Sequence, residues 1–164
     1  MGATVDNRTK RAASCSDVQQ LVEKIMVNEF SRELGRELGR ATIPIGKAKV
    51  TVDGFHHDEG HLVLVEAWAH IGKVRKAQRD KVLGDMLKLT LVTSVLRRSD
   101  PSLKIESYLL FADQMAARLV NGKGWPSLAA KEFGVATRVI PLSEDVIKTI
   151  QEAQRRQDIR VIDE

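Results

Sequence analysis

The chain has 164 residues, of which 43% are hydrophobic, 29% are charged and 4% are aromatic, and its formal net charge is +4. This length suits one domain with a buried core. No hydrophobic run approaches the roughly 20 residues that a membrane-spanning helix needs, so we expect no membrane partner. The single cysteine, Cys15, excludes an internal disulfide and a thiolate zinc cluster.

The first segment, residues 1–15, is polar and basic, and it lacks the hydrophobic stretch that is typical of a secretory signal. We therefore expect a flexible basic tail over 1–15, a single domain over 16–164 and a cytoplasmic location. The positive net charge favours a polyanionic partner such as nucleic acid. Because aromatic residues are scarce, contacts with phosphates should outweigh base stacking.

Hydrophobic periodicity and turn residues predict the elements in chain order. Ser16 or Asp17 should cap a first helix that begins near Val18. The segments expected next are one bent or two short strands over 41–55, a strand over 61–69, a long helix over 73–98, a strand over 104–112, helices over 113–122 and 125–134, a strand over 136–142, and a last helix capped by Ser143. This order describes an α/β fold with a mixed sheet of about four or five strands flanked by helices.

Two acidic residues lie in the strands expected at 41–55 and 61–69. Glu59-Gly60 is the natural two-residue turn between these strands, because such turns favour glycine at their second position. That register places Asp53 directly opposite Glu66, where like charges repel. Since the surroundings of Glu66 are hydrophobic, a carboxylate there is costly unless something compensates it.

A pair of adjacent carboxylates can share a proton, accept a basic side chain or bind a divalent cation. Lys49 faces the same side as Asp53 but lies ~13 Å away along the strand, so it is poorly placed to neutralise the pair. Bound Mg²⁺ or Mn²⁺ accounts for the pair better, because these ions prefer hard oxygen ligands. The alternative is structural: one acid caps a turn and the other forms an ion pair.

Asp53 near a strand end, the hairpin, the sequence VEAWA at 65–69 and the long helix after it resemble the PD-(D/E)xK phosphodiesterase superfamily. The resemblance covers roughly residues 16–112 and implies a restriction-endonuclease-like core, with 136–142 as a further strand. It also implies that Asp53 and Glu66 ligate Mg²⁺ or Mn²⁺. A glutamate of the first helix often contributes in that superfamily, and Glu29 is the candidate here, with a plain surface role as the alternative.

The sequence departs from the superfamily pattern at Trp68, where a lysine is expected. Such a lysine positions the attacking water and stabilises developing negative charge. Some members supply it from the following helix instead. In the helix expected at 73–98, one stripe is hydrophobic at both ends and polar in the middle: Val74, Gln78, Lys81, Asp85, Lys88, Val92 and Leu96. By resemblance, Gln78 and Lys81 are the candidates, and the alternative is a polar face that simply meets solvent.

Two hypotheses follow. The first is a metal-dependent nuclease acting on DNA, with RNA the less favoured substrate; the second is a catalytically inactive nuclease-like domain that binds nucleic acid or acts as a scaffold, which Trp68 favours. The four histidines between 56 and 70 do not converge in the expected register, and no HExxH, CxxC or P-loop pattern occurs. The sequence leaves the oligomeric state open, a homo-oligomer included.

Overall fold

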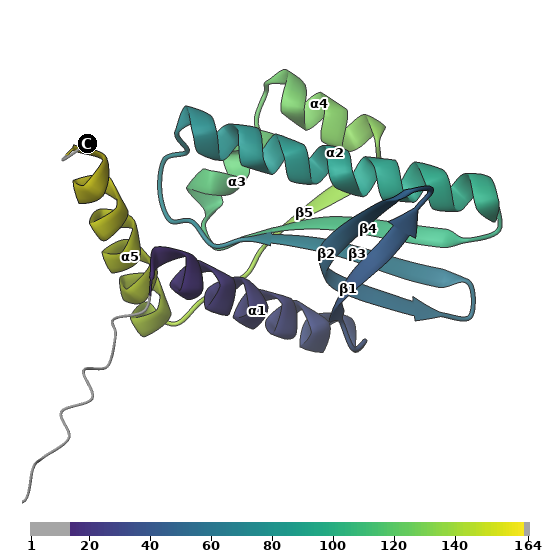
Figure 1. Ribbon diagram of the computed structural model, residues 1–164, viewed down its shortest axis with the longest axis horizontal. Coiled ribbons are helices and arrows are strands. Elements are labelled where there is room, and N and C mark those ends of the chain that lie inside the picture. Colours follow the sequence, from purple (N-terminus) through teal and green to yellow (C-terminus); the bar gives the residue numbers. More distant parts are fainter. Residues whose placement is uncertain (1–13, 163–164) are drawn as a thin grey trace, which may run out of the picture.

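The computed structural model describes residues 14–162, with side chains described as far as Gln157. The tail expected over 1–15 falls almost entirely outside this range. Within it the elements are α1 (Cys15–Leu34), β1 (Gly39–Ile45), β2 (Ala48–Asp58), β3 (His61–Trp68), α2 (Lys76–Ser99), β4 (Lys104–Phe111), α3 (Gln114–Asn121), α4 (Trp125–Glu132), β5 (Val135–Val139) and α5 (Glu144–Ile162). Figure 1 shows their arrangement.

The five strands form one mixed sheet in the order β1-β2-β3-β4-β5. The first three are antiparallel neighbours, whereas β3, β4 and β5 run parallel. Parallel neighbours need a crossover, and α2 supplies it between β3 and β4, as α3 and α4 do between β4 and β5. The structure thus confirms the α/β fold class and the mixed sheet flanked by helices.

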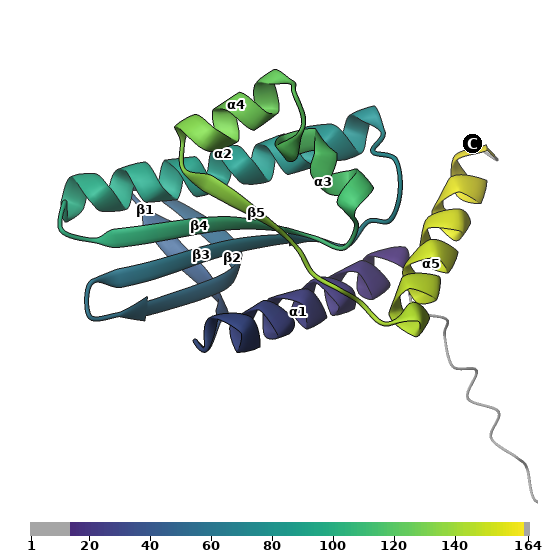
Figure 2. The ribbon, with the colours of Figure 1, turned by 180° about the vertical axis from the view of Figure 1, so that it is seen from behind.

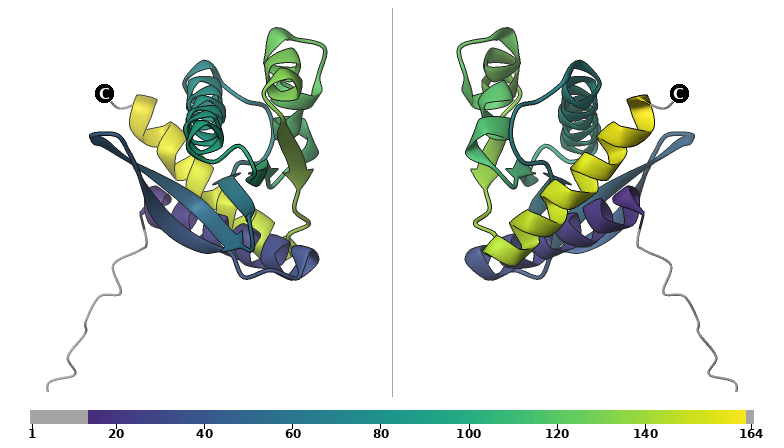
Figure 3. Two further views of the ribbon diagram at one scale, coloured as in Figure 1. Left: turned by 90° about the vertical axis from the view of Figure 1, so that its right-hand side faces the viewer. Right: turned by 90° about the vertical axis from the view of Figure 1, so that its left-hand side faces the viewer.

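Helices cover both faces of the sheet, as the end-on views of Figure 3 show. On one face, Leu64 of β3 shares a buried cluster with Leu89 of α2, to which α3 and α4 also contribute. On the other face, Val65 shares a cluster with Phe30 of α1 and with Ile150 of α5. Because both faces of β3 are buried, its residues 62–65 are continuously hydrophobic instead of alternating.

The first helix begins earlier than expected, because Ser14 and not Ser16 or Asp17 caps it. The Ser14 hydroxyl accepts a hydrogen bond from the Asp17 backbone N–H at 3.2 Å, and the Asp17 carboxylate accepts one from the Ser14 N–H at 2.9 Å. This reciprocal capping box satisfies two backbone donors that the helix itself leaves open. The helix ends at Leu34, where Gly35 adopts a left-handed conformation (φ 64°).

The last helix, α5, packs against the start of α1 and extends away from the sheet (Figures 1 and 2). The thiol of Cys15 donates a hydrogen bond to the Ala153 carbonyl at 3.0 Å across this contact. Among residues 14–162, no helix has the length and hydrophobicity that crossing a bilayer requires.

The hairpin between β2 and β3 has the expected turn. Glu59 (φ 39°) and Gly60 (φ 80°) both have positive φ, which a type I′ turn requires. Asp58 pairs with His61, and the ladder continues in the expected register to Gly54 and Val65.

A β-bulge interrupts β2 beside Asp53. Gly39 pairs with Phe55 and Ala41 pairs with Val52, so two steps along β1 correspond to three steps along β2. As a result, Val52 and Phe55 both pack on the α2 face, although residues three apart in a regular strand face opposite sides. Bulges of this kind redirect a side chain, and here that side chain is Asp53.

Replacing Gly54 with alanine should destabilise the bulge. A Cβ at this position would lie 3.0 Å from the Val65 Cβ and 3.1 Å from the Val27 Cγ1. Such overpacking costs about 1–3 kcal/mol. A Cβ on Gly39 would meet nothing within 4 Å, so Gly39→Ala is the matched control. Urea denaturation checks the prediction, and equal effects of the two substitutions would contradict it.

Candidate functional site

The site lies where β2 and β3 separate. The last pair of their ladder is Gly54 with Val65, so β2 provides no partner for the Ala67 N–H. The Asp53 carboxylate takes this place and accepts a hydrogen bond from the Ala67 N–H at 3.1 Å. Glu23 of α1 interacts with the backbone of Ala69, two residues further along. Two carboxylates thus bind the backbone that follows Val65, where β2 no longer pairs with β3.

The third acid, Glu66, points to the α2 face of the sheet and is only 3% exposed. The Lys88 ammonium of α2 lies 2.7 Å from Glu66 Oε1 and 3.4 Å from Asp85 Oδ1. The contact with Glu66 has the length of an ion pair but not the angles of a hydrogen bond, so this buried Oε1 has no well-directed donor. Asp53 and Glu66 do not pair across the strands as expected: the ladder ends at Gly54 and Val65, and Asp53 borders a cavity beside α1. The charge of Asp53 nevertheless adds to the rise in the pKa of Glu66.

The electrostatics of the site follow from burial. Burial raises the pKa of Glu66 to about 8, with the ion pair to Lys88 opposing the shift and Asp53 adding to it. Burial also raises the pKa of Glu23, against a hydrogen bond from Gln19 and the charge of Lys81. The pKa of Lys88 is raised because Glu66 and Asp85 outweigh its partial burial. Burial therefore disfavours the charged forms of both Glu66 and Glu23.

The raised pKa of Glu66 predicts how stability depends on pH. Between its ordinary value of 4.5 and about 8, the native state holds a proton that the unfolded chain releases. The free energy of unfolding should therefore fall as pH rises through this window, by up to about 1.4 kcal/mol per pH unit. Glu66→Gln should flatten this slope, whereas Glu29→Gln should keep it. Chemical denaturation across the pH range checks the prediction; an unchanged slope in Glu66→Gln would contradict it.

Gln78 and Lys81, the candidates from the long helix, have different surroundings in α2. Gln78 is occupied at the start of α2: its Oε1 accepts a hydrogen bond from the Arg75 N–H at 2.8 Å, and its Nε2 lies 3.4 Å from His70 Nδ1. Lys81 donates to Asp85 at 3.0 Å, and its charge lowers the pKa of Glu23. Lys81 therefore lies beside the acids Glu23 and Asp85, whereas Gln78 chiefly orders the start of α2.

The structure does not bring Glu29 to Asp53. Glu29 is half-buried and pairs with Arg32 on its own helix. Glu23, six residues earlier, is the acid of α1 that interacts with Asp53. The sequence carried a signal for it, because Glu23 precedes the buried Met26 and Val27 at helical spacing.

Lys88 is the second residue that the sequence prediction missed. It stands in the polar middle of the stripe that contains Gln78 and Lys81, but sequence spacing does not tell which lysine of the stripe meets the acids. The structure answers this through the 2.7 Å contact between Lys88 and Glu66.

Trp68 is a packing residue. It is 5% exposed, it stacks on His70 with ring centroids 4.7 Å apart, and it meets Phe111 edge to face. The position where the superfamily carries a lysine is thus part of the hydrophobic core.

The histidines do not form a metal site. His61 pairs with Glu106 at 2.9 Å, and His56 contacts the Glu37 carbonyl at 3.0 Å on the α1 side. Between residues 14 and 157, no three or more His, Cys, Asp or Glu side chains are grouped so as to hold a metal ion. Within this range the structure therefore does not bring Asp53, Glu66 and Glu29 together as a three-ligand group.

Comparisons with known proteins give a fold. No protein-family model and no curated protein matches the chain. An XisH family protein from Nostoc punctiforme is similar with a TM-score of 0.53 and 14% identity, and an FdxN element excision controlling factor protein from Anabaena variabilis with 0.54 and 13%. Each comparison covers 79% of this chain and 94% of the other. The likeness shows that these proteins share the α/β fold with a mixed sheet flanked by helices that the sequence predicts.

Proposed function

We propose that the chain is a metal-dependent phosphodiesterase that acts on nucleic acid, with DNA preferred over RNA. One observation carries the proposal: where β2 and β3 separate, Asp53 binds the Ala67 N–H next to Glu66, and Glu66 pairs with Lys88. Two acids and a lysine are the groups that the PD-(D/E)xK resemblance implies, and Lys88 comes from α2, as in members with a displaced lysine. Lys88 therefore replaces Lys81 as the proposed catalytic lysine, and Lys81 and Gln78 become supporting residues.

The acids fit a divalent ion. Glu66 is buried with an oxygen that lacks a well-directed donor, and Asp53 is its electrostatic neighbour. Mg²⁺ commonly takes one or two carboxylates and completes its shell with water and phosphate oxygens, so two ligands suffice. When bound, such an ion lowers the pKa of a coordinated water and offsets charge on the phosphoryl group.

The protein's own groups have separate roles. The Ala67 N–H orients Asp53, while Lys88 holds Glu66 and places a positive charge beside the reacting phosphate. Lys76 and Arg79, exposed on the first turns of α2, would hold the backbone of the substrate. Phosphate contacts of this kind release counterions, so binding should weaken as salt rises.

Plasmid nicking tests the proposal. The wild-type protein should nick supercoiled DNA in Mn²⁺ and lose this activity in EDTA. Lys88→Met keeps the hydrophobic stem but removes the charge, and it should slow nicking about 10²-fold or more. Lys148→Ala, an exposed change on α5, is the control. Nicking that survives EDTA, or that Lys88→Met leaves unchanged, would contradict the proposal.

A second function has an observation in its favour. Lys88 already compensates Glu66, and three-ligand metal groups are missing from residues 14–157. Both features also suit a nuclease-like domain that binds nucleic acid or a protein partner without cleaving. Calorimetry with Mn²⁺ separates the two functions: the nuclease should bind the ion through Asp53 and Glu66, whereas the inactive domain should show no metal affinity and no cleavage.

A further inference from the structure

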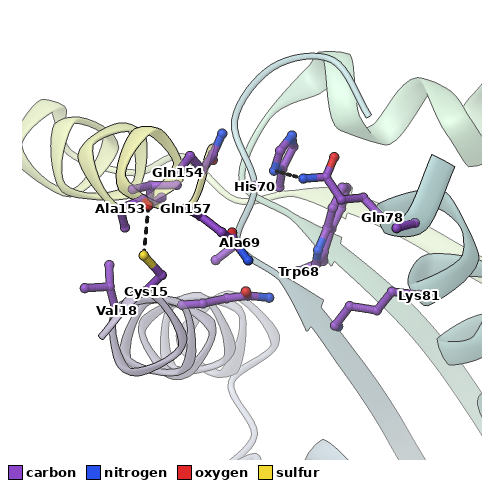
Figure 4. A pocket seen from close by; sticks show the side chains of 13 residues that line it. Cys15, Val18, Trp68, Ala69, His70, Gln78, Lys81, Ala153, Gln154 and Gln157 are labelled. Atoms are coloured by element: carbon purple, nitrogen blue, oxygen red, sulfur yellow. Dashed lines mark hydrogen bonds between the residues drawn. The ribbon is translucent and has the colours of Figure 1, made fainter. Parts of the chain in front are cut away.

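A cavity of about 240 Å³ adjoins the proposed site, between α1, α5 and the start of α2. Figure 4 shows Cys15 and Val18 of α1 on one side of it and Gln78 and Lys81 of α2 on the other. Ligand pockets for drug-sized molecules measure ~300–1,000 Å³, so this cavity suits a smaller group.

The lining combines carboxamides with small hydrophobic walls. Gln19, Gln78, Gln154 and Gln157 contribute the amides. Gln154 is committed to structure, because it accepts a hydrogen bond from the Ile71 N–H at 2.9 Å and donates to the Ile71 carbonyl at 3.1 Å.

Other polar atoms of the lining remain available to a ligand. Gln19 uses its Nε2 to donate to Glu23 at 2.8 Å. Within residues 14–157, no hydrogen bond engages Gln19 Oε1 or the Gln157 amide. Carboxamides offer a donor and an acceptor side by side, which is the pattern that pairs with the edge of a nucleobase.

The cavity lies near the acids Glu23 and Glu66. Trp68, which lines it, lies two residues beyond Glu66 on β3, a separation of ~7 Å. Lys81 lines the cavity and also interacts with Glu23, so its charge stands between the cavity and the acids. A phosphate attached to a group in the cavity would meet Lys81 on its way to Asp53 and Glu66.

We propose that this cavity receives one unpaired nucleobase next to the scissile phosphate, so that the substrate is a single strand, a frayed end or a locally unpaired segment of a supercoiled plasmid. The proposal rests on the proposed phosphodiesterase function and specifies its substrate. A base held in a duplex cannot enter, because its edge is paired and its faces are stacked. Gln19 and Gln157 read the edge of the base, while Val18, Ile150 and Ala153 cover it.

A variant that fills the cavity tests the proposal. Ala77 lines the cavity on α2 but is exposed, so Ala77→Phe should narrow the cavity without disturbing the core. Ala136→Phe, at an exposed position of β5 outside the cavity lining, is the matched control. Binding is measured by fluorescence anisotropy in Ca²⁺, with a labelled single-stranded oligonucleotide and with an abasic oligonucleotide of equal length and charge.

Wild-type protein and the Ala136→Phe control should bind the base-containing strand at least about tenfold more tightly than the abasic strand, as expected for one well-held base. Ala77→Phe should bind the two strands equally. Equal binding by the wild type, or an undiminished preference in Ala77→Phe, would overturn the base pocket. Because this readout needs no cleavage, it judges the pocket even if nicking fails, and active nicking without a base preference would refute the pocket alone.

Discussion

Glu66→Gln should abolish Mn²⁺-dependent nicking, with a loss of about 10³-fold or more. The substitution keeps the shape of the side chain but removes the charge that would hold the ion, and the ion contributes several kcal/mol of charge stabilisation to the transition state. The protein should stay folded, because a glutamine is neutral at every pH, whereas Glu66 in the wild type becomes a buried charge at and above pH 8. Initial nicking rates and calorimetric Mn²⁺ titration measure the two effects.

Two matched variants locate the loss. Asp53→Asn should lose both Mn²⁺ binding and nicking, because Asp53 is the second proposed ligand and its charge acts on Glu66. Glu29→Gln should keep both, since Glu29 pairs with Arg32 away from Asp53. Nicking and Mn²⁺ affinity that persist in Glu66→Gln and Asp53→Asn would refute the site.

Trp68→Lys should destabilise the protein by about 3–5 kcal/mol or more and should not raise its activity. The change would restore the lysine of the superfamily pattern, but it removes an indole that packs on His70 and Phe111. Deleting a buried tryptophan costs about 3–5 kcal/mol, and an ammonium placed among apolar groups adds to that cost. Since each kcal/mol lowers the melting temperature of a domain this size by roughly 2–4 °C, the drop should be about 10 °C.

Trp125→Lys is the matched control, because Trp125 is 58% exposed. It should shift stability by no more than about 0.5 kcal/mol, as surface substitutions usually do. Differential scanning calorimetry measures both variants. A Trp68→Lys protein that melts like the wild type and nicks DNA faster would show that position 68, and not Lys88, is the place for the catalytic lysine.

Local patterns were enough for the strands that carry the acids. The Glu59-Gly60 turn was predictable because both residues must take positive φ in a two-residue hairpin, and the turn sets the register of the ladder as far as Gly54 and Val65, one pair short of Asp53 and Glu66. The hydrophobic run of β3 and the punctuating glycines and prolines were enough to predict the element order and the fold class.

Three features needed the tertiary structure. The bulge at Asp53 arises from the pairing of β2 with β1. In the sheet, β1 lies on the opposite side of β2 from β3. The choice of Lys88 over Lys81 depends on the height at which α2 crosses β3, and both lysines share one stripe of the helix. The choice of Glu23 over Glu29 depends on where α1 crosses the place at which β2 and β3 separate.

The amino-acid sequence by itself determined the elements of this protein, their order and the register of one hairpin, because turns, caps and periodicity act between residues close in the chain. Only the tertiary structure decided which helical side chains reach the place where β2 and β3 separate, and where the nearby cavity opens. Those contacts join segments far apart in sequence, and the packing angles that create them leave no local pattern.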